Sequence, residues 1–208
     1  MRSAAGLGKE QENGRGKGMI EPVFLASCSP RRGGNSDAAV LLVRQALGAP
    51  CREFRIADAG VRPCVSCGFC DAHPGRCALD APGDGAKALF DAVCRAPLSV
   101  LVSPVYFYHL PAQAKAWIDR AQRFWKCTDK PGGGRPVTAV LIGARPRGDK
   151  LFEGAERTLR YMALALGLEW VEPLRLYGLD GPEDLAGHAE ASARVVEFAA
   201  SLSRFVLP

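Results

Sequence analysis

Short apolar runs rich in β-branched residues alternate with longer segments of helical spacing from Met19 to the end of the chain. This alternation is typical of βαβ units, and the nearly continuous apolar character of the central runs predicts parallel strands covered on both faces. The five expected strands are Val23–Cys28, Arg52–Ile56, Ser99–Val102, Val137–Ile142 and Trp170–Tyr177. The pattern therefore predicts an α/β fold.

A helix is expected after each strand, and three of these helices have recognisable boundaries. They are predicted at Ser36–Leu47, Gly85–Cys94 and Pro111–Trp125. The first begins at a capping Ser or Asn, the second follows Asp84 as N-cap, and the third opens with proline. An apolar stripe that ends at Trp125, and a similar one from Leu185 to Ser203, predict that both of these helices lie against the sheet.

Length and composition are those of one globular domain. The chain has 208 residues, of which 48% are hydrophobic and 24% charged, which excludes a disordered or fibrous chain. Residues 1–18 contain five glycines and mixed charge, so they are predicted to be a disordered extension before one domain over residues 19–208. No apolar run approaches the roughly 20 residues that span a bilayer, and no signal peptide is recognisable. We therefore expect a cytoplasmic protein without membrane association.

The net charge of +5 says little about partners. Four basic and two acidic residues within positions 1–18 contribute +2, which leaves +3 for the remaining chain. No Lys/Arg stripe typical of a nucleic-acid surface follows, so no nucleic-acid partner is expected. Arg145, Arg147 and Lys150 after the fourth strand are candidates for attracting a nucleotide phosphate, or else belong to a solvated loop.

The first strand runs into a loop that combines three anion-binding features. Free N–H groups are expected where the next helix begins, and Ser29, Arg31, Asn35 and Ser36 add hydroxyl, guanidinium and amide groups. The Gly-Lys-Ser/Thr ending of a Walker loop and the dinucleotide glycine pattern are both missing. The loop fits a phosphate monoester, and an ordinary βα turn remains the alternative.

Four of the eight cysteines lie within fourteen residues after the second strand. They are Cys64, Cys67, Cys70 and Cys77, with glycines at 68 and 75 that permit a tight backbone. This spacing lets thiolates converge on one cluster. Zinc more often takes two separated cysteine pairs, and a disulfide or free thiols are further alternatives.

Other chemical groups are given structural interpretations. Cys28, Cys51, Cys94 and Cys127 are expected to be small buried hydrophobic residues. Asp80 and His73 flank the cysteine cluster as conceivable ligands, although polar loop residues are the simpler interpretation. His109 is expected to be solvated or structurally hydrogen-bonded, and no partner is named for His188.

Two segments together resemble the flavodoxin-like FMN reductases. Ser29-Pro30-Arg31 with Gly34-Asn35-Ser36 looks like the family's phosphate loop. The segment from Ser103 to Arg120, SPVYFYHLPAQAKAWIDR, is similar to the family's Thr-Pro-Val-Tyr-(Phe/Trp)-Tyr…Lys-x-(Phe/Trp)-Ile-Asp-Arg. The resemblance implies a flavodoxin-like three-layer sandwich with a five-stranded parallel sheet of order 2-1-3-4-5.

The resemblance also implies where cofactors bind. FMN would lie at the carboxyl edge of the sheet, its phosphate held by Ser29, Arg31, Asn35 and Ser36. Its isoalloxazine ring would be bordered by Pro104, Val105, Tyr106 and Phe107. The cysteine segment resembles the compact motif of iron-sulfur flavoproteins, which implies a 4Fe-4S cluster on Cys64, Cys67, Cys70 and Cys77 near FMN, at that same edge.

The function expected from these resemblances is an FMN-dependent oxidoreductase. Electrons would come from NADH, NADPH or a redox protein such as ferredoxin and pass to an unidentified acceptor. The flavin performs the chemistry, so no catalytic side chain is predicted, and a homodimer or homotetramer is expected because relatives usually assemble. The alternatives are a non-enzymatic FMN/iron-sulfur electron carrier and a thiol- or metal-binding protein that has lost flavin.

Overall fold

The computed structural model describes residues 21–206, and its strands form one parallel sheet. The strands are β1 (Val23–Ser27), β2 (Cys51–Arg55), β3 (Ser99–Pro104), β4 (Pro136–Ile142), β5 (Glu169–Trp170) and β6 (Leu174–Leu176). Their order is β2-β1-β3-β4-β5, with β6 also paired to β4. The predicted order 2-1-3-4-5 is therefore confirmed. The predicted extension over residues 1–18 lies outside the described residues.

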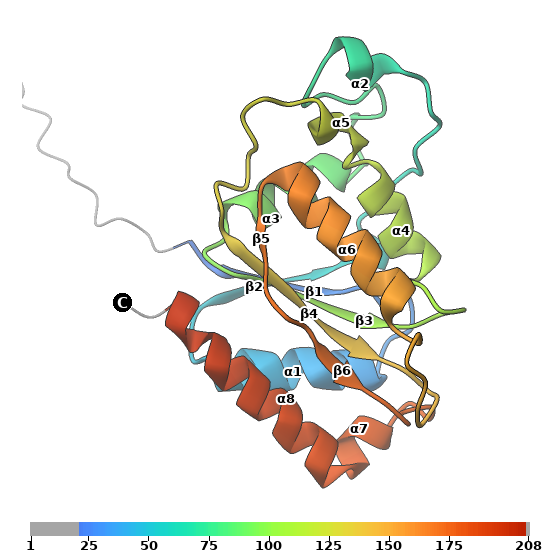
Figure 1. Ribbon diagram of the computed structural model, residues 1–208, viewed down its shortest axis with the longest axis vertical. Helices are drawn as coiled ribbons and strands as arrows, with labels where there is room; N and C mark the ends of the chain where they lie inside the picture. The colour runs from blue at the N-terminus through green and yellow to red at the C-terminus, as the bar shows by residue number, and fades with distance from the viewer. Residues whose placement is uncertain (1–20, 207–208) are drawn as a thin grey trace, which may run out of the picture.

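Helices cover both faces of the sheet (Figure 1). They are α1 (Asn35–Leu47), α2 (Phe69–Ala72), α3 (Ala86–Arg95), α4 (Ala112–Asp119), α5 (Gln122–Trp125), α6 (Glu153–Leu166), α7 (Asp184–Gly187) and α8 (Ala189–Leu202), with short 3-10 turns at Ile56–Asp58 and Ser203–Phe205. α1 and α8 lie on one face, and α3, α4 and α6 lie on the other. No helix among residues 21–206 is long and apolar enough to cross a bilayer.

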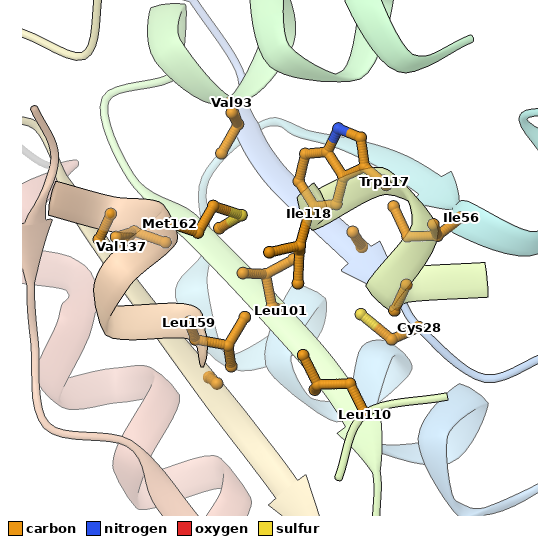
Figure 2. Close-up of a cluster of buried hydrophobic side chains, with 14 of the residues drawn as sticks. Cys28, Ile56, Val93, Leu101, Leu110, Trp117, Ile118, Val137, Leu159 and Met162 are labelled. Carbon is orange, nitrogen blue, oxygen red and sulfur yellow. The ribbon is translucent and has the colours of Figure 1, made fainter. Parts of the chain in front are cut away.

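The alternation of side chains along β1 divides the core into two layers. Phe24 and Ala26 belong to the cluster under α3, α4 and α6, whereas Val23 and Leu25 belong to the cluster under α1 and α8. The first layer contains Trp117, which is fully buried (Figure 2). Its ring packs against that of Phe24, with 6.3 Å between the ring centroids. This packing fixes α4 across the sheet, and with it the segments at both ends of α4.

The predicted fifth strand is divided in two. β5 pairs with the start of β4 and β6 with its end, and residues 171–173 between them are outside both strands. Pro173 lies in this gap, and a proline has no N–H to donate to a sheet ladder. The continuous strand Trp170–Tyr177 is therefore a wrong prediction.

The predicted helix Pro111–Trp125 is also divided, into α4 and α5. At the break the N–H groups of Arg120 and Ala121 bond to carbonyls three residues back, at 3.0 and 2.8 Å, which tightens the turn. Trp125 consequently leaves the apolar stripe and is 49% exposed, contrary to the prediction. The expected Ser or Asn cap of α1 is absent too, because Gly34 occupies the N-cap position without any side-chain cap.

Candidate functional site

The two predicted cofactor loops line one cavity at the carboxyl ends of β1, β3 and β4. The cavity has a volume of about 240 Å³, and further lining comes from the loops after β4 and β6. Its predicted site residues are Ser29, Arg31, Asn35, Ser36, Pro104, Val105 and Tyr106, and Gly34 of the phosphate-loop motif lies among them. The sequence did not single out the other lining residues, which are Ile142, Ala144, Leu179 and Asp180. Phe107 does not line the cavity and is 99% exposed.

A partly buried ion pair that the sequence did not reveal holds the loop between β1 and α1. Asp37 in the first turn of α1 accepts the Gly33 N–H at 2.7 Å and pairs with Arg55 at the end of β2. Arg55 also donates to the carbonyl oxygens of Ser29 and Arg31, at 3.0 and 3.2 Å. In the sequence, this pair could have been found from an acid in the first turn of the helix and an arginine at the end of the next strand. Together they hold the loop backbone in place with the start of α1 uncapped.

Two of the four predicted polar side chains of this loop, those of Asn35 and Ser29, are already hydrogen-bonded within the protein. Asn35 donates to the carbonyls of Leu179 and Gly181, at 3.3 and 2.8 Å, and accepts the Leu185 N–H at 2.9 Å. The Ser29 hydroxyl accepts the Arg31 N–H at 3.2 Å. Asn35 thus ties α1 to the C-terminal segment. The group of Asn35 that can still bind an anion is its backbone N–H, at the uncapped start of α1.

Arg31 lies over the loop. Its side chain is exposed, yet a Cβ built on Gly34 would be 3.1 Å from its Nε. Glycine at position 34 therefore leaves space for the guanidinium to lie against the start of α1, where it adds positive charge to that of the helix N-terminus.

A tight aromatic hairpin borders the other side of the cavity. Tyr106 and His109 exchange backbone hydrogen bonds of 2.8 and 3.0 Å, while Phe107 and Tyr108 have φ values of +47° and +62°. Two successive positive φ values define a type I′ turn, in which glycine or asparagine is usual. In this turn both positions are aromatic instead. Tyr106, just before them, lines the cavity, whereas the ring of Phe107 is exposed to solvent.

His109 anchors this hairpin. Its Nδ1 accepts the Leu110 N–H at 2.9 Å, and its Nε2 lies 3.0 Å from the Thr158 hydroxyl. Burial, together with nearby Lys115, lowers the pKa of the imidazole below its ordinary value. The neutral ring is therefore fully hydrogen-bonded, in agreement with the structural interpretation of His109. His188 has a comparable role, since its Nδ1 caps α8 by accepting the Ala191 N–H.

The four clustered cysteines line a second cavity of about 420 Å³. Cys64, Cys67, Cys70 and Cys77 share it with residues that include Asp119 and Gln122, and all four are free thiols. Within residues 21–206 no three or more His, Cys, Asp or Glu side chains come close enough to hold a single metal ion. A zinc site requires such convergence, whereas a 4Fe-4S cluster binds each thiolate on a separate iron.

The two cavities are not adjacent, contrary to the expectation of a shared edge. They have no lining residue in common: the cysteine cavity adjoins Asp119 at the end of α4, whereas Pro104–Tyr106 precede its start. The eight residues of α4 span about 12 Å at 1.5 Å per residue. In Figure 1 the cysteine loop, which includes α2, lies beyond α5 and far from the carboxyl ends of the strands.

The side chains that flank the cysteines bond within the protein. His73 stacks on Phe69, and its Nδ1 lies 3.0 Å from the carbonyl oxygen of that residue. Asp80 forms ion pairs with Arg120 and Arg123, at 2.9 and 2.6 Å. Both side chains therefore hold the loop in shape.

Comparison with known proteins decides the family. The profile of the NADPH-dependent FMN reductase family matches residues 22–165. The chain belongs to this family. The family resemblance inferred from the two motifs is confirmed, and family membership makes the chain an FMN-dependent oxidoreductase enzyme.

Individual relatives agree with this assignment. An iron-sulfur flavoprotein of Methanocaldococcus jannaschii is 32% identical over 147 residues, which are 66% of this chain and 67% of that protein. Among solved structures, a flavone reductase superposes with a TM-score of 0.66 at 12% identity, over 88% of this chain and 62% of its own. A flavodoxin, WrbA-like protein of Agrobacterium tumefaciens gives 0.54 at 12% identity, over 89% and 96%. These structures establish the flavodoxin-like fold.

Proposed function

We propose that this FMN reductase family member binds FMN across the 240 Å³ cavity, with the phosphate at the start of α1. The observation that carries the proposal is that two motifs about seventy residues apart line one cavity. A cavity of this volume is below the usual range for a whole cofactor. It encloses the phosphate end, and the ring system extends along the aromatic hairpin.

The residues of the loop have distinct roles in this proposal. The uncapped N–H groups of α1 and the Arg31 guanidinium bind the phosphate, and the Ser36 hydroxyl adds a donor. Pro104, Val105 and Tyr106 supply the apolar side of the ring site. FMN itself, when bound, accepts a hydride from a nicotinamide nucleotide and passes the electrons on. The side chains position the cofactor, and none is required as a general acid or base.

The loop after β4 supports a nicotinamide nucleotide as donor. Arg145 pairs with the Tyr108 hydroxyl, and its guanidinium lies 5.8 Å from the centre of that ring. Arg147 and Lys150 follow on the same exposed loop, next to Ala144 in the cavity wall. These charges are suited to the phosphates of a nucleotide that stacks on the ring from solvent.

For the second cavity we propose a 4Fe-4S cluster on Cys64, Cys67, Cys70 and Cys77. Four free thiols around one hollow of about 420 Å³ support it, as does the name of the M. jannaschii relative. The cluster would give electrons a one-electron route to a protein such as ferredoxin.

We also propose assembly into a homodimer or homotetramer, supported by the exposed apolar side chains of Trp125, Tyr161 and Leu164.

Arg31→Ala tests the flavin site. Loss of one charged hydrogen-bond donor costs about 1.5–3 kcal/mol, so affinity for FMN should fall about 10- to 100-fold while affinity for riboflavin stays unchanged. Quenching of flavin fluorescence measures both constants.

Arg32→Ala is the matched control, because Arg32 lies outside the cavity and pairs with Asp58 at an exposed site. Equal losses for FMN and riboflavin in Arg31→Ala, or equal losses for FMN in the two variants, would remove Arg31 from the phosphate site.

A further inference from the structure

Arg120, the last residue of the SPVYFYHLPAQAKAWIDR segment, has no part in the flavin cavity. It is 1% exposed, which is exceptional for a charged side chain unless it is paired. Its guanidinium donates to Asp84 and to Asp80, both at 2.9 Å. Nε is buried without a hydrogen-bond partner. Ion pairs, and not apolar packing alone, therefore hold the Arg120 side chain.

The groups that bind Arg120 come from both ends of the cysteine loop. On one side Arg120 donates to the carbonyl of Arg62, two residues before Cys64, at 3.0 Å. On the other it bonds to Asp80, whose own N–H donates to the carbonyl of Cys77 at 3.2 Å. A single buried side chain thus joins the beginning and the end of the loop to α4.

Arg123 reinforces this attachment. It is 2% exposed and donates to both carboxylate oxygens of Asp80, at 2.6 and 2.8 Å. The 3-10-like break after α4 places Arg120 and Arg123 on the same carboxylate.

The charges of the ion pairs at the end of the cysteine loop do not cancel, and the two acids that line the cysteine cavity, Asp71 and Asp119, are each paired with a lysine. Arg62, Arg120 and Arg123 surround Asp80 and Asp84, which gives three positive charges against two negative ones. Asp80, which binds both Arg120 and Arg123, donates its own N–H to the carbonyl of Cys77. The two guanidinium groups therefore lie next to the end of the cysteine loop.

We propose that Arg120 is a positioning residue for the cysteine site, which fixes both ends of the loop and supplies positive charge beside Cys77. The charge role rests on the cluster proposed above. A cluster with four thiolate ligands is an anion that gains one further negative charge on reduction, so a nearby cation favours the reduced state. Arg120 then determines both the conformation of the cysteine loop and the reduction potential of the cluster.

Hydrogen exchange in iron-free protein tests the positioning role. Arg120→Gln should raise exchange at amides of residues 64–77 at least tenfold, since the loop loses its attachment at both ends. Lys126→Gln is the matched control: it removes another ion pair to the same loop, Lys126–Asp71 at 2.8 Å, but an exposed one. Equal exchange in the two variants would overturn the positioning role.

The reduction potential of the loaded cluster tests the charge role. Arg120→Gln should shift the one-electron equilibrium at least tenfold toward the oxidised state, or about 59 mV downward. Asp84→Asn should shift it upward. Arg120→Lys should keep the potential near that of the wild type while loop exchange stays raised, because lysine preserves the charge but not the forked donor geometry. The charge role would be overturned if Arg120→Gln and Asp84→Asn shifted the potential in the same direction. Equal potentials in Arg120→Gln and Arg120→Lys would also overturn it.

Two controls keep the outcomes distinct. If Arg120→Gln fails to fold, as circular dichroism would show, loop exchange and the reduction potential are measured on Arg120→Lys and Asp84→Asn instead. If anaerobically purified wild-type protein contains no iron or sulfide, the proposed cluster and the charge role fail together, and loop exchange alone decides the positioning role.

Discussion

At the scale of single residues, the side chains best suited to a ligand by type are not always free to bind one. Asn35 makes three hydrogen bonds to the C-terminal segment, at 3.3, 2.8 and 2.9 Å. Ser36, the next residue, is buried, and its hydroxyl makes no hydrogen bond to another group of residues 21–206. The two positions look equivalent in the sequence and differ in the fold.

Asn35→Ala and Ser36→Ala should therefore have opposite consequences. Asn35→Ala leaves buried groups unpaired and should lower the free energy of unfolding by about 2–4 kcal/mol, without changing the ratio of FMN to riboflavin affinity. Ser36→Ala should lower that ratio with little loss of stability. Urea denaturation and flavin titration measure the two effects, and a reduced affinity ratio in Asn35→Ala alone would contradict this assignment.

At the scale of elements, the aromatic hairpin depends on a neutral histidine. The pKa of His109 is lowered in the folded protein, so the unfolded chain binds a proton more readily than the native hairpin does. The contribution of His109 to stability is complete above the ordinary pKa of 6.5 and is lost as the pH falls through that value toward the folded pKa. Protonation would also displace the Leu110 N–H from Nδ1.

The expected result is a hairpin that loosens in mildly acidic solution. In NMR titrations the His109 ring should titrate below pH 6.5, and exchange of the Leu110 amide should rise as it does so. His109→Gln should remove this pH dependence. A His109 pKa at or above 6.5 would show that the hairpin does not favour the neutral ring.

Also at this scale, the pattern of the chain predicted where elements lie better than where they end. The parallel sheet and the helices that cover it follow from apolar periodicity, because a βαβ chain has few ways to bury its strands, whereas the strand order was predicted from the family resemblance. The break at Pro173 has a local signal, because a proline has no N–H to donate, whereas the residues after Asp119 bind partners far along the chain, such as Asp80. Local spacing does not encode those contacts.

At the scale of the whole molecule, the two cavities are separate structures on one domain. They have no lining residue in common, and α4 lies between them. Flavin and cluster should therefore load independently. Electron exchange between them has to cross α4 within one chain, or pass between copies in the proposed assembly.

Cys70→Ser is expected to lose iron and sulfide while retaining FMN, whereas Arg31→Ala should retain iron and lose FMN. Visible spectra with iron and sulfide analysis of anaerobically purified protein measure both. Cys127→Ser is the control, because Cys127 is partly buried outside the cysteine cavity. Loss of FMN in Cys70→Ser in proportion to iron would contradict independent loading.

The sequence by itself determined the family and, through that resemblance, the strand order, and it predicted both candidate sites, because βα loops carry their ligand chemistry in contiguous residues. The tertiary structure alone decided which of those residues are free and how the sites lie. Asn35 and Arg120 are each committed to partners distant in sequence, and the cysteine loop is held at the far end of α4 instead of the carboxyl edge. Buried polar groups must be satisfied by whatever the fold brings near, and no local motif specifies those partners.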